Sequence, residues 1–214
     1  MAARTLHRQP YVPTEEEHRL IEQTILNYPR QIEETRFRNW VIFKLASLTG
    51  MRINEVLNIE IKHINLGRRI ITIPAENSKN RVESFVYICD ELMTILKDYL
   101  EKYKPDKYLF YNFYENELYK GKKISVQAYH KCWKKYLTSC NLNEIKFLDK
   151  LNRPRQKIAF HSATRTYFIN RLFKNNPNLN ISELSRISRH RSIDCLYNYY
   201  LRFNDFEIWQ KVKI

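Results

Sequence analysis

Residues 158–173 read I-A-F-H-S-A-T-R-T-Y-F-I-N-R-L-F, and after a polar break residues 181–202 read I-S-E-L-S-R-I-S-R-H-R-S-I-D-C-L-Y-N-Y-Y-L-R. His161 and Arg165 in the first segment are four positions apart, so we expect both on one face of a helix. A guanidinium binds phosphate oxygens, and an imidazole can transfer protons. The rest of the chain is expected to serve these two segments.

The second segment adds another imidazole and a phenol. His190 is followed nine residues later by Tyr199. A phenol has an ordinary pKa of about 10, so it attacks phosphorus at neutral pH only when a base accepts its proton. Together with the histidine and arginine of the first segment, these side chains form a set suited to attack on a phosphodiester.

The charge of the chain indicates its partner. Among 214 residues, 37 are Lys or Arg and 23 are Asp or Glu, so the net charge is +14 and the pI is near 9.6. Such an excess points to a polyanion, and nucleic acid is the leading candidate. The sequence shows neither a run of about 18 apolar residues nor a signal peptide, so we expect a soluble cytoplasmic protein without membrane association.

Four cysteines are present, and none of them stands in a C-x-x-C pair or at the Cys/His spacing of a zinc site. We therefore expect reduced, mostly buried thiols, with no disulfide, metal or cofactor. The four are Cys89, Cys132, Cys140 and Cys195.

The first half of the chain predicts helices and a hairpin. Thr14 with Glu17 predicts the capping box of a first helix. A second helix is expected to end at Gly50, which can adopt the left-handed conformation, and a third is expected at residues 54–62 with Asn54 as its cap.

The apolar runs 69–74 and 84–88 predict two strands joined by a polar turn, with Lys79 at its tip. Asp90 is expected to cap a helix through Tyr103. Ser125 is expected to begin another helix that ends near Cys140, and residues 141–157 are expected to be a surface connector. The prediction is a mainly α-helical domain with a small antiparallel sheet.

Four motifs in series carry a resemblance. They are T-G-M-R-I-N-E-V-L at 49–57, the hairpin lysine, F-H-S-A-T-R at 160–165 and R-H-R-S-I-D-C-L-Y-N-Y at 189–199. In their order, and nearly in their spacing, these motifs resemble those of the catalytic domain of the tyrosine recombinases, the phage integrase family. The resemblance covers roughly residues 13–202. The resemblance implies the mixed helical catalytic fold, double-stranded DNA as partner, and site-specific strand breakage and rejoining in the setting of a mobile element.

The resemblance also implies roles for single residues. Arg52 and Arg165 would grip the scissile phosphate, and a planar guanidinium suits this role because it binds oxygens in pairs and stays charged. Tyr199 would form the 3′-phosphotyrosine and release a 5′-hydroxyl, with Tyr200 as the alternative nucleophile. His161 would accept the phenol proton.

Three further residues complete the implied site. Lys79 would donate a proton to the leaving 5′-oxygen, with Arg81 as the alternative. His190 would donate a hydrogen bond to the phosphate. Glu55 would hold Arg52 and the histidine in position without contacting the phosphate itself. The mechanism requires no metal.

The sequence departs from the family pattern at three places. The family spaces its first histidine and second arginine as H-x-x-R, whereas this chain has H-x-x-x-R, so either the helix start is shifted or Ser162 takes the place of the histidine. Arg189 replaces a glycine before the second histidine, which reduces turn flexibility or indicates a helical path. Met1 lies near the family's inter-domain junction, so we expect the N-terminal core-binding domain to be absent.

The expected organisation is a basic arm at 1–12, the catalytic domain at 13–202 and an amphipathic tail at 203–214. The resemblance implies that this tail docks on a neighbouring protomer in a tetramer on DNA. Three alternatives stay open: an inactive DNA-binding or regulatory module of the same fold, a type IB topoisomerase and, more distantly, an RNA-binding protein.

Overall fold

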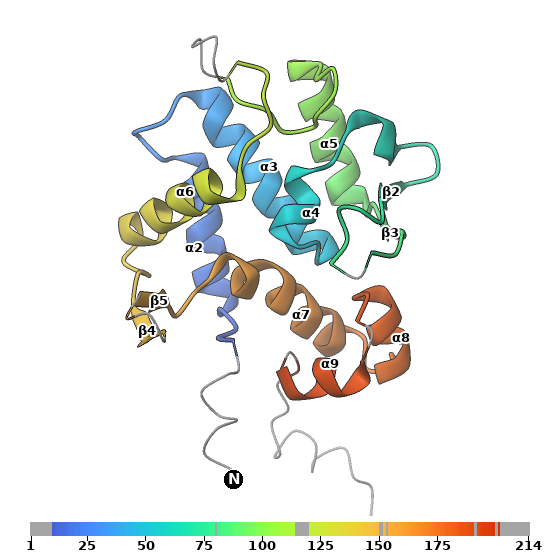
Figure 1. The fold of residues 1–214 in the computed structure, drawn as a ribbon. Helices are drawn as coiled ribbons and strands as arrows, with labels where there is room; N and C mark the ends of the chain where they lie inside the picture. Colours follow the sequence, from blue (N-terminus) through green and yellow to red (C-terminus); the bar gives the residue numbers. More distant parts are fainter. Residues whose placement is uncertain are drawn as a thin grey trace, which may run out of the picture.

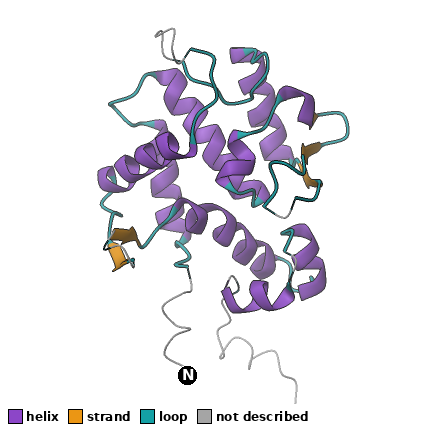
Figure 2. Cartoon of the chain, viewed as in Figure 1, coloured by secondary structure: helices purple, strands orange, loops and turns teal. Residues whose placement is uncertain are grey.

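The computed structural model describes residues 10–79, 81–113, 120–149, 152, 154–190, 192–199 and 201, apart from the side chains of residues 198 and 199. Within these ranges the chain is mainly helical with short antiparallel strands, which confirms the predicted fold class (Figure 2). The arm at 1–12 lies outside them except for its last three residues, and so does the tail at 203–214.

The helices divide into a larger body and a smaller C-terminal group (Figure 1). The body contains α2 (Glu15–Leu26), α3 (Glu33–Thr49), α4 (Ile53–Leu57), the 3₁₀ turn η1 (Ile61–His63), α5 (Asp90–Tyr103) and α6 (Val126–Ser139). The C-terminal group contains the π-helical turn η2 (Ser162–Thr166), α7 (Tyr167–Asn175), α8 (Ile181–Ile187) and α9 (Ile193–Tyr199).

The predicted hairpin is present and gains a third strand. Strands β1 (Ile64–Asn65), β2 (Ile70–Ile73) and β3 (Ser84–Tyr87) form an antiparallel sheet in the order β1-β2-β3. Ile71 of β2 pairs with Val86 of β3, and both face the core, whereas Phe85 and Tyr87 are exposed. This alternation is the period of two that a half-buried sheet requires.

Two predicted helix ends follow from local chemistry. Thr14 accepts a hydrogen bond from the Glu17 backbone N–H, and the Glu17 carboxylate accepts one from the Thr14 N–H, so the capping box of α2 is confirmed. Gly50 ends α3 with a φ of 65°, the left-handed conformation that glycine adopts without a steric cost. Ser125 caps α6, as predicted.

The predicted third helix at 54–62 is wrong in both bounds. Arg52 is the N-cap of α4, and the helix ends at Leu57. The next residues leave the helix because their backbone bonds to a distant loop: the Leu109 N–H donates to the Ile59 carbonyl, and the Ile61 N–H donates to the Lys107 carbonyl. Asn54 therefore lies inside the first turn and is not its cap.

Two further predictions are corrected. Cys89 is the N-cap of α5, and Asp90 forms an ion pair with Arg69 at 2.7 Å instead of capping the helix. The supposed connector at 141–157 contains an antiparallel hairpin of β4 (Ile145–Leu148) and β5 (Pro154–Gln156). All four residues of β4 are exposed, so neither face of this short strand is buried in the core.

Packing around α3 forms the main core. Val41, Ile42, Phe43, Leu45 and Ala46 are fully buried where α3 packs against α2, α5 and η2, and each large side chain contributes about 2 kcal/mol by its burial.

A second cluster of buried residues (Ile169, Leu184, Leu196 and Leu201) joins α7, α8 and α9. This cluster fixes the position of α9 relative to α8. Across the described part of the chain, no helix combines the length and the apolar character needed to cross a bilayer.

Candidate active site

The turn between α3 and α4 brings two distant parts of the chain into contact. A Cβ atom added at Gly50 would lie 2.6 Å from Cδ1 of Phe168 in α7, a distance that real Cβ atoms do not show. The glycine therefore serves two purposes, because it also ends α3 with a positive φ. The close approach brings the Gly50 carbonyl to Arg165.

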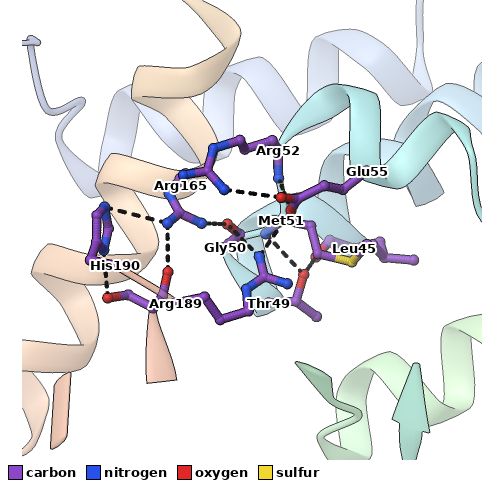
Figure 3. A network of polar contacts seen from close by, with 10 residues as sticks. Leu45, Thr49, Gly50, Met51, Arg52, Glu55, Arg165, Arg189 and His190 are labelled. Atoms are coloured by element: carbon purple, nitrogen blue, oxygen red, sulfur yellow. Dashed lines mark hydrogen bonds and ion pairs between the residues drawn. The ribbon is translucent and has the colours of Figure 1, made fainter. Parts of the chain in front are cut away.

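Arg165 ties three segments together at the centre of the site (Figure 3). Its side chain is fully buried. Nη1 donates to the Gly50 carbonyl at 2.6 Å, and Nη2 donates to the Ser188 carbonyl at 2.5 Å. The planar guanidinium is thus held by backbone acceptors from the end of α3 and the end of α8, which fixes its orientation.

Arg52 and Glu55 form the second part of the site. Glu55 is only 4% exposed, so it is not a solvated surface charge. Its Oε2 accepts the backbone N–H of Arg52 at 2.9 Å, and its Oε1 pairs with Arg52 Nη1 at 3.0 Å. One carboxylate therefore positions both the backbone and the side chain of Arg52.

The helix that carries His161 and Arg165 contains a π-helical turn. The Tyr167 N–H donates to the Ser162 carbonyl, five residues earlier, and η2 covers Ser162–Thr166. A π turn contains one residue more than an α turn. It therefore accommodates the one additional residue that H-x-x-x-R has over H-x-x-R. A regular α-helix would not accommodate this residue. Ser162 is buried within this turn.

His190 is held by a serine and an arginine. Ser188 Oγ donates to the Leu184 carbonyl at 2.6 Å and lies 2.7 Å from His190 Nδ1, so its oxygen accepts from Nδ1–H. Arg165 Nη2 lies 3.3 Å from Nε2, which accepts in this tautomer. Arg189, just before it, has a φ of 56°, a left-handed conformation that glycine adopts readily, and not a helical path.

Both histidines are neutral at neutral pH. Burial, then the charges of Arg165 and Arg52, lowers the pKa of His161 to about 4. Burial and the same two arginines lower the pKa of His190 to about 3. Lys79 also lowers the pKa of His161, while Glu55 raises it. The charges of these groups act on His161, which stands four residues before Arg165 in the chain.

Of the remaining predicted residues, the structure describes the side chains of Lys79 and Arg81 but not those of Tyr199 and Tyr200. Lys79 is exposed in the turn between β2 and β3. Arg81 in the same turn is exposed as well. Tyr199 is the last residue of α9, but its side chain lies outside the described part of the chain, and Tyr200 lies outside it altogether.

Sequence reasoning missed two contributions. Ser188 orients His190 and accepts from Arg165, and the spacing S-x-H offered a weak signal for the first contact. Arg189 was noted only as a replaced glycine, yet its Nη2 pairs with Glu55 Oε2 at 3.0 Å. That pair joins positions 134 residues apart, which no local pattern predicts.

A cavity of about 1060 Å³ adjoins the cluster. Arg52, Glu55, Arg189 and His190 line one side, and residues of the β2–β3 hairpin line the other. Among the residues described, no group of three or more His, Cys, Asp or Glu side chains is arranged to hold a metal ion. The cavity wall offers the cations Arg52 and Arg189 and the neutral imidazole of His190 to an anion.

A sequence model of the phage integrase family matches residues 14–206. Tyrosine recombinase XerA of Saccharolobus solfataricus is 32% identical over 96 residues, which cover 42% of this chain and 32% of the relative. A probable integrase/recombinase of Acholeplasma phage L2 is 24% identical over 195 residues, which cover 89% of this chain and 58% of the relative. The chain thus spans about a third of the first relative and somewhat over half of the second.

Solved structures share the fold. XerA recombinase aligns with 96% of this chain and 67% of its own, at a TM-score of 0.69 and 16% identity. XerH recombinase in a post-cleavage complex with difH substrate aligns with 95% of this chain and 52% of its own. The TM-score is 0.69 and the sequence identity is 20%. The alignment with the catalytic domain of bacteriophage HP1 integrase covers 95% of both chains, with a TM-score of 0.58 and a sequence identity of 16%. With the family match over nearly its whole length, the chain belongs to the phage integrase family and has the fold of a tyrosine recombinase catalytic domain.

Proposed function

We propose that the chain breaks and rejoins DNA strands at specific sites through a covalent 3′-phosphotyrosine. One observation carries this proposal above the others: Arg52 and Arg165, 113 positions apart in sequence, lie in one cluster with His190, and their charges also act on His161. Buried, preoriented cations act on the charge of a phosphoryl transition state because they need no reorganisation during the reaction.

The two guanidinium groups bind the non-bridging oxygens of the scissile phosphate. Glu55 holds Arg52, and the Gly50 and Ser188 carbonyls hold Arg165. Their geometry is thus set before the substrate enters. Because positioning and charge stabilisation make up most of the catalysis of phosphoryl transfer, rigid cations are the main requirement.

Proton transfer is assigned to the side chains around the phosphate. The phenol oxygen of Tyr199 attacks phosphorus, His161 accepts the phenol proton, and the bond to the 5′-oxygen breaks. Lys79 gives a proton to that oxygen. His161 suits a base because its lowered pKa, about 4, leaves it unprotonated at neutral pH.

His190 donates to a phosphate oxygen from Nε2, in the imidazolium form. Its pKa is low in the free protein because it is buried and because Arg165 and Arg52 oppose a further positive charge. A bound phosphate supplies the opposite charge and favours protonation. Religation reverses the steps with a 5′-hydroxyl as attacking group, so it needs no external energy source.

Double-stranded DNA is the proposed substrate. The net charge of +14 supports it, as do neighbours of the same fold that were solved with DNA, such as XerH with difH and the Tn1549 integrase with transposon right-end DNA. Assembly of four protomers on DNA through the tail at 203–214 belongs to the same proposal.

Trapping the adduct tests the chemistry. The protein is incubated with nicked DNA or with a 5′-bridging phosphorothiolate strand, and a denaturing gel is followed by mass spectrometry of any DNA-linked peptide. We expect attachment at Tyr199 that is lost in Tyr199→Phe. Attachment at Tyr200 would retain the reaction and correct the nucleophile.

Other outcomes point to the alternatives. Tight DNA binding without an adduct over a range of sites would overturn the proposal in favour of an inactive module. An adduct combined with relaxation of a plasmid that lacks any specific site would favour a topoisomerase. Unchanged assembly on DNA after deletion of residues 203–214 would contradict the role of the tail.

A further inference from the structure

Arg189 occupies a backbone conformation that few non-glycine residues adopt. Its φ of 56° lies in the left-handed region, where a Cβ atom crowds the following carbonyl. Its side chain nevertheless reaches inward, with only 11% of its surface exposed. A strained backbone persists where other interactions hold it, so the contacts of the side chain need an explanation.

Those contacts are made with the two acceptors that orient the phosphate-binding arginines. Arg189 Nη2 lies 3.0 Å from Glu55 Oε2 and 3.5 Å from the Gly50 carbonyl. The same carboxylate holds Arg52 through Oε1 at 3.0 Å, and the same carbonyl accepts from Arg165 at 2.6 Å. Arg189 is thus the side chain that touches both supports at once (Figure 3).

Charge favours a role beyond packing. Arg52 and Arg189 share the single carboxylate of Glu55, so the cluster carries an excess of positive charge. Nε and Nη1 of Arg189 are buried and have no hydrogen-bond partner within the described residues. A buried guanidinium with unused donors is expensive to maintain. An anion in the adjoining cavity, which Arg189 lines, would reduce this excess.

We propose that Arg189 is a positioning residue for strand cleavage: by binding Glu55 and the Gly50 carbonyl it holds Arg52 and Arg165 in a fixed relation to one another. The inference rests on the proposed strand-transfer function and adds a residue to it. A glycine at this position would leave Glu55 with Arg52 alone and would free the Gly50 carbonyl from its second donor.

Arg189→Gly separates this role from a purely structural one because it relieves the left-handed backbone while it removes the side chain. With the full chain and a nicked DNA substrate, we expect adduct formation at saturating protein to slow by about 10- to 100-fold, the usual effect of losing a residue that orients a functional group. The DNA dissociation constant is expected to stay within about twofold. Arg189→Lys, which retains the charge without the fork, should recover part of the rate.

Arg69→Gly is the matched control. Arg69 also has a positive φ, 55°, and its side chain also pairs with a carboxylate, Asp90, but this pair is exposed and lies outside the site. We expect its rate of adduct formation to match the wild type. A Glu55→Gln background tests the route, because Arg189→Gly should then slow the reaction little further if it acts through Glu55.

The outcomes are distinct. A wild-type rate in Arg189→Gly, a loss equal to that of Arg69→Gly, or a loss that multiplies with Glu55→Gln would overturn the inference and leave the proposed function intact. If Arg189→Gly does not fold, Arg189→Lys decides, and a wild-type rate in that variant overturns the inference. Absence of an adduct from the wild type would overturn the proposed function and this inference together.

Discussion

Glu55 is the residue on which the geometry of the cluster depends. It is buried and pairs with Arg52 at 3.0 Å on one oxygen and with Arg189 at 3.0 Å on the other. Removing one partner of a buried ion pair is far more damaging than removing an exposed pair, since the remaining charge stays buried without compensation.

Glu55→Gln should therefore lower the free energy of unfolding by about 3 kcal/mol and slow adduct formation. Urea titrations at pH 7.5 measure the first effect, and single-turnover cleavage measures the second. Glu91→Gln is the control, because Glu91 pairs with Lys44 while its own side chain is 52% exposed. That change is expected to alter stability by less than about 1 kcal/mol. Equal effects of the two substitutions would contradict the special position of Glu55.

The histidine base predicts the pH dependence of cleavage. His161 accepts a proton only when it is neutral, so activity falls as the pH drops through its folded pKa, which burial and the neighbouring arginines lower to about 4. Since kcat/KM reports the free protein, the titration of His161 should cause no fall in kcat/KM between about pH 8 and 5, whereas the imidazolium required at His190, whose pKa is about 3, should make kcat/KM rise as the pH falls. Cleavage rates with subsaturating DNA test this. An acid limb near the ordinary histidine pKa would show that His161 is not the base or is not buried.

Two short elements place the site, and both depend on unusual backbone. The end of α3 requires Gly50 for its positive φ and for the close approach of Phe168. The π turn η2 then brings Arg165 back to the Gly50 carbonyl. A local change at either element is expected to disturb the contact between the larger body and the C-terminal helices.

Gly50→Ala should destabilise the protein more than Gly121→Ala. Both glycines have a positive φ, 65° and 69°, but nothing lies within 4 Å of a Cβ at Gly121, whereas Phe168 would be 2.6 Å from one at Gly50. The conformational cost is about 1 kcal/mol at each position, and the clash adds to it only at Gly50. Thermal unfolding measures both, and Phe168→Ala should reduce the extra loss at Gly50. Equal losses would refute the close approach.

Histidine burial couples the stability of the whole molecule to pH. His18 of α2 stacks on Tyr167 of α7 with ring centroids 3.9 Å apart and lies 3.3 Å from Ser47 Oγ. Burial, with the charges of Lys44 and Arg171, lowers its pKa to about 4. The unfolded chain binds a proton near pH 6.5, so the stabilisation is complete above that pH and is lost as the pH falls towards 4.

We expect His18 alone to account for a loss of about 2 kcal/mol between pH 8 and 5. His18→Phe keeps an aromatic ring in the stack and removes the titration. Urea unfolding of both proteins at the two pH values gives the difference. The variant should show a smaller loss by about that amount, and an identical pH dependence in both proteins would contradict a buried, neutral His18.

Much of the architecture is visible in local patterns. The capping box of α2, the glycine that ends α3 and the β2–β3 hairpin were predictable because each depends on neighbouring residues. The hairpin β4–β5 was not, since its strands are only four and three residues long and neither is buried in the core. The end of α4 was not either, because backbone bonds to residues 107 and 109 terminate it.

The sequence by itself determined the family, the helical class and the residue types of the site, because motif order and hydrophobic spacing are properties of short segments. Only the tertiary structure decided that Arg189 shares Glu55 with Arg52, and that a π turn absorbs the extra residue before Arg165. The reason is physical: a buried charge takes whichever partner the packing brings within about 3 Å, and that partner stands 134 positions away.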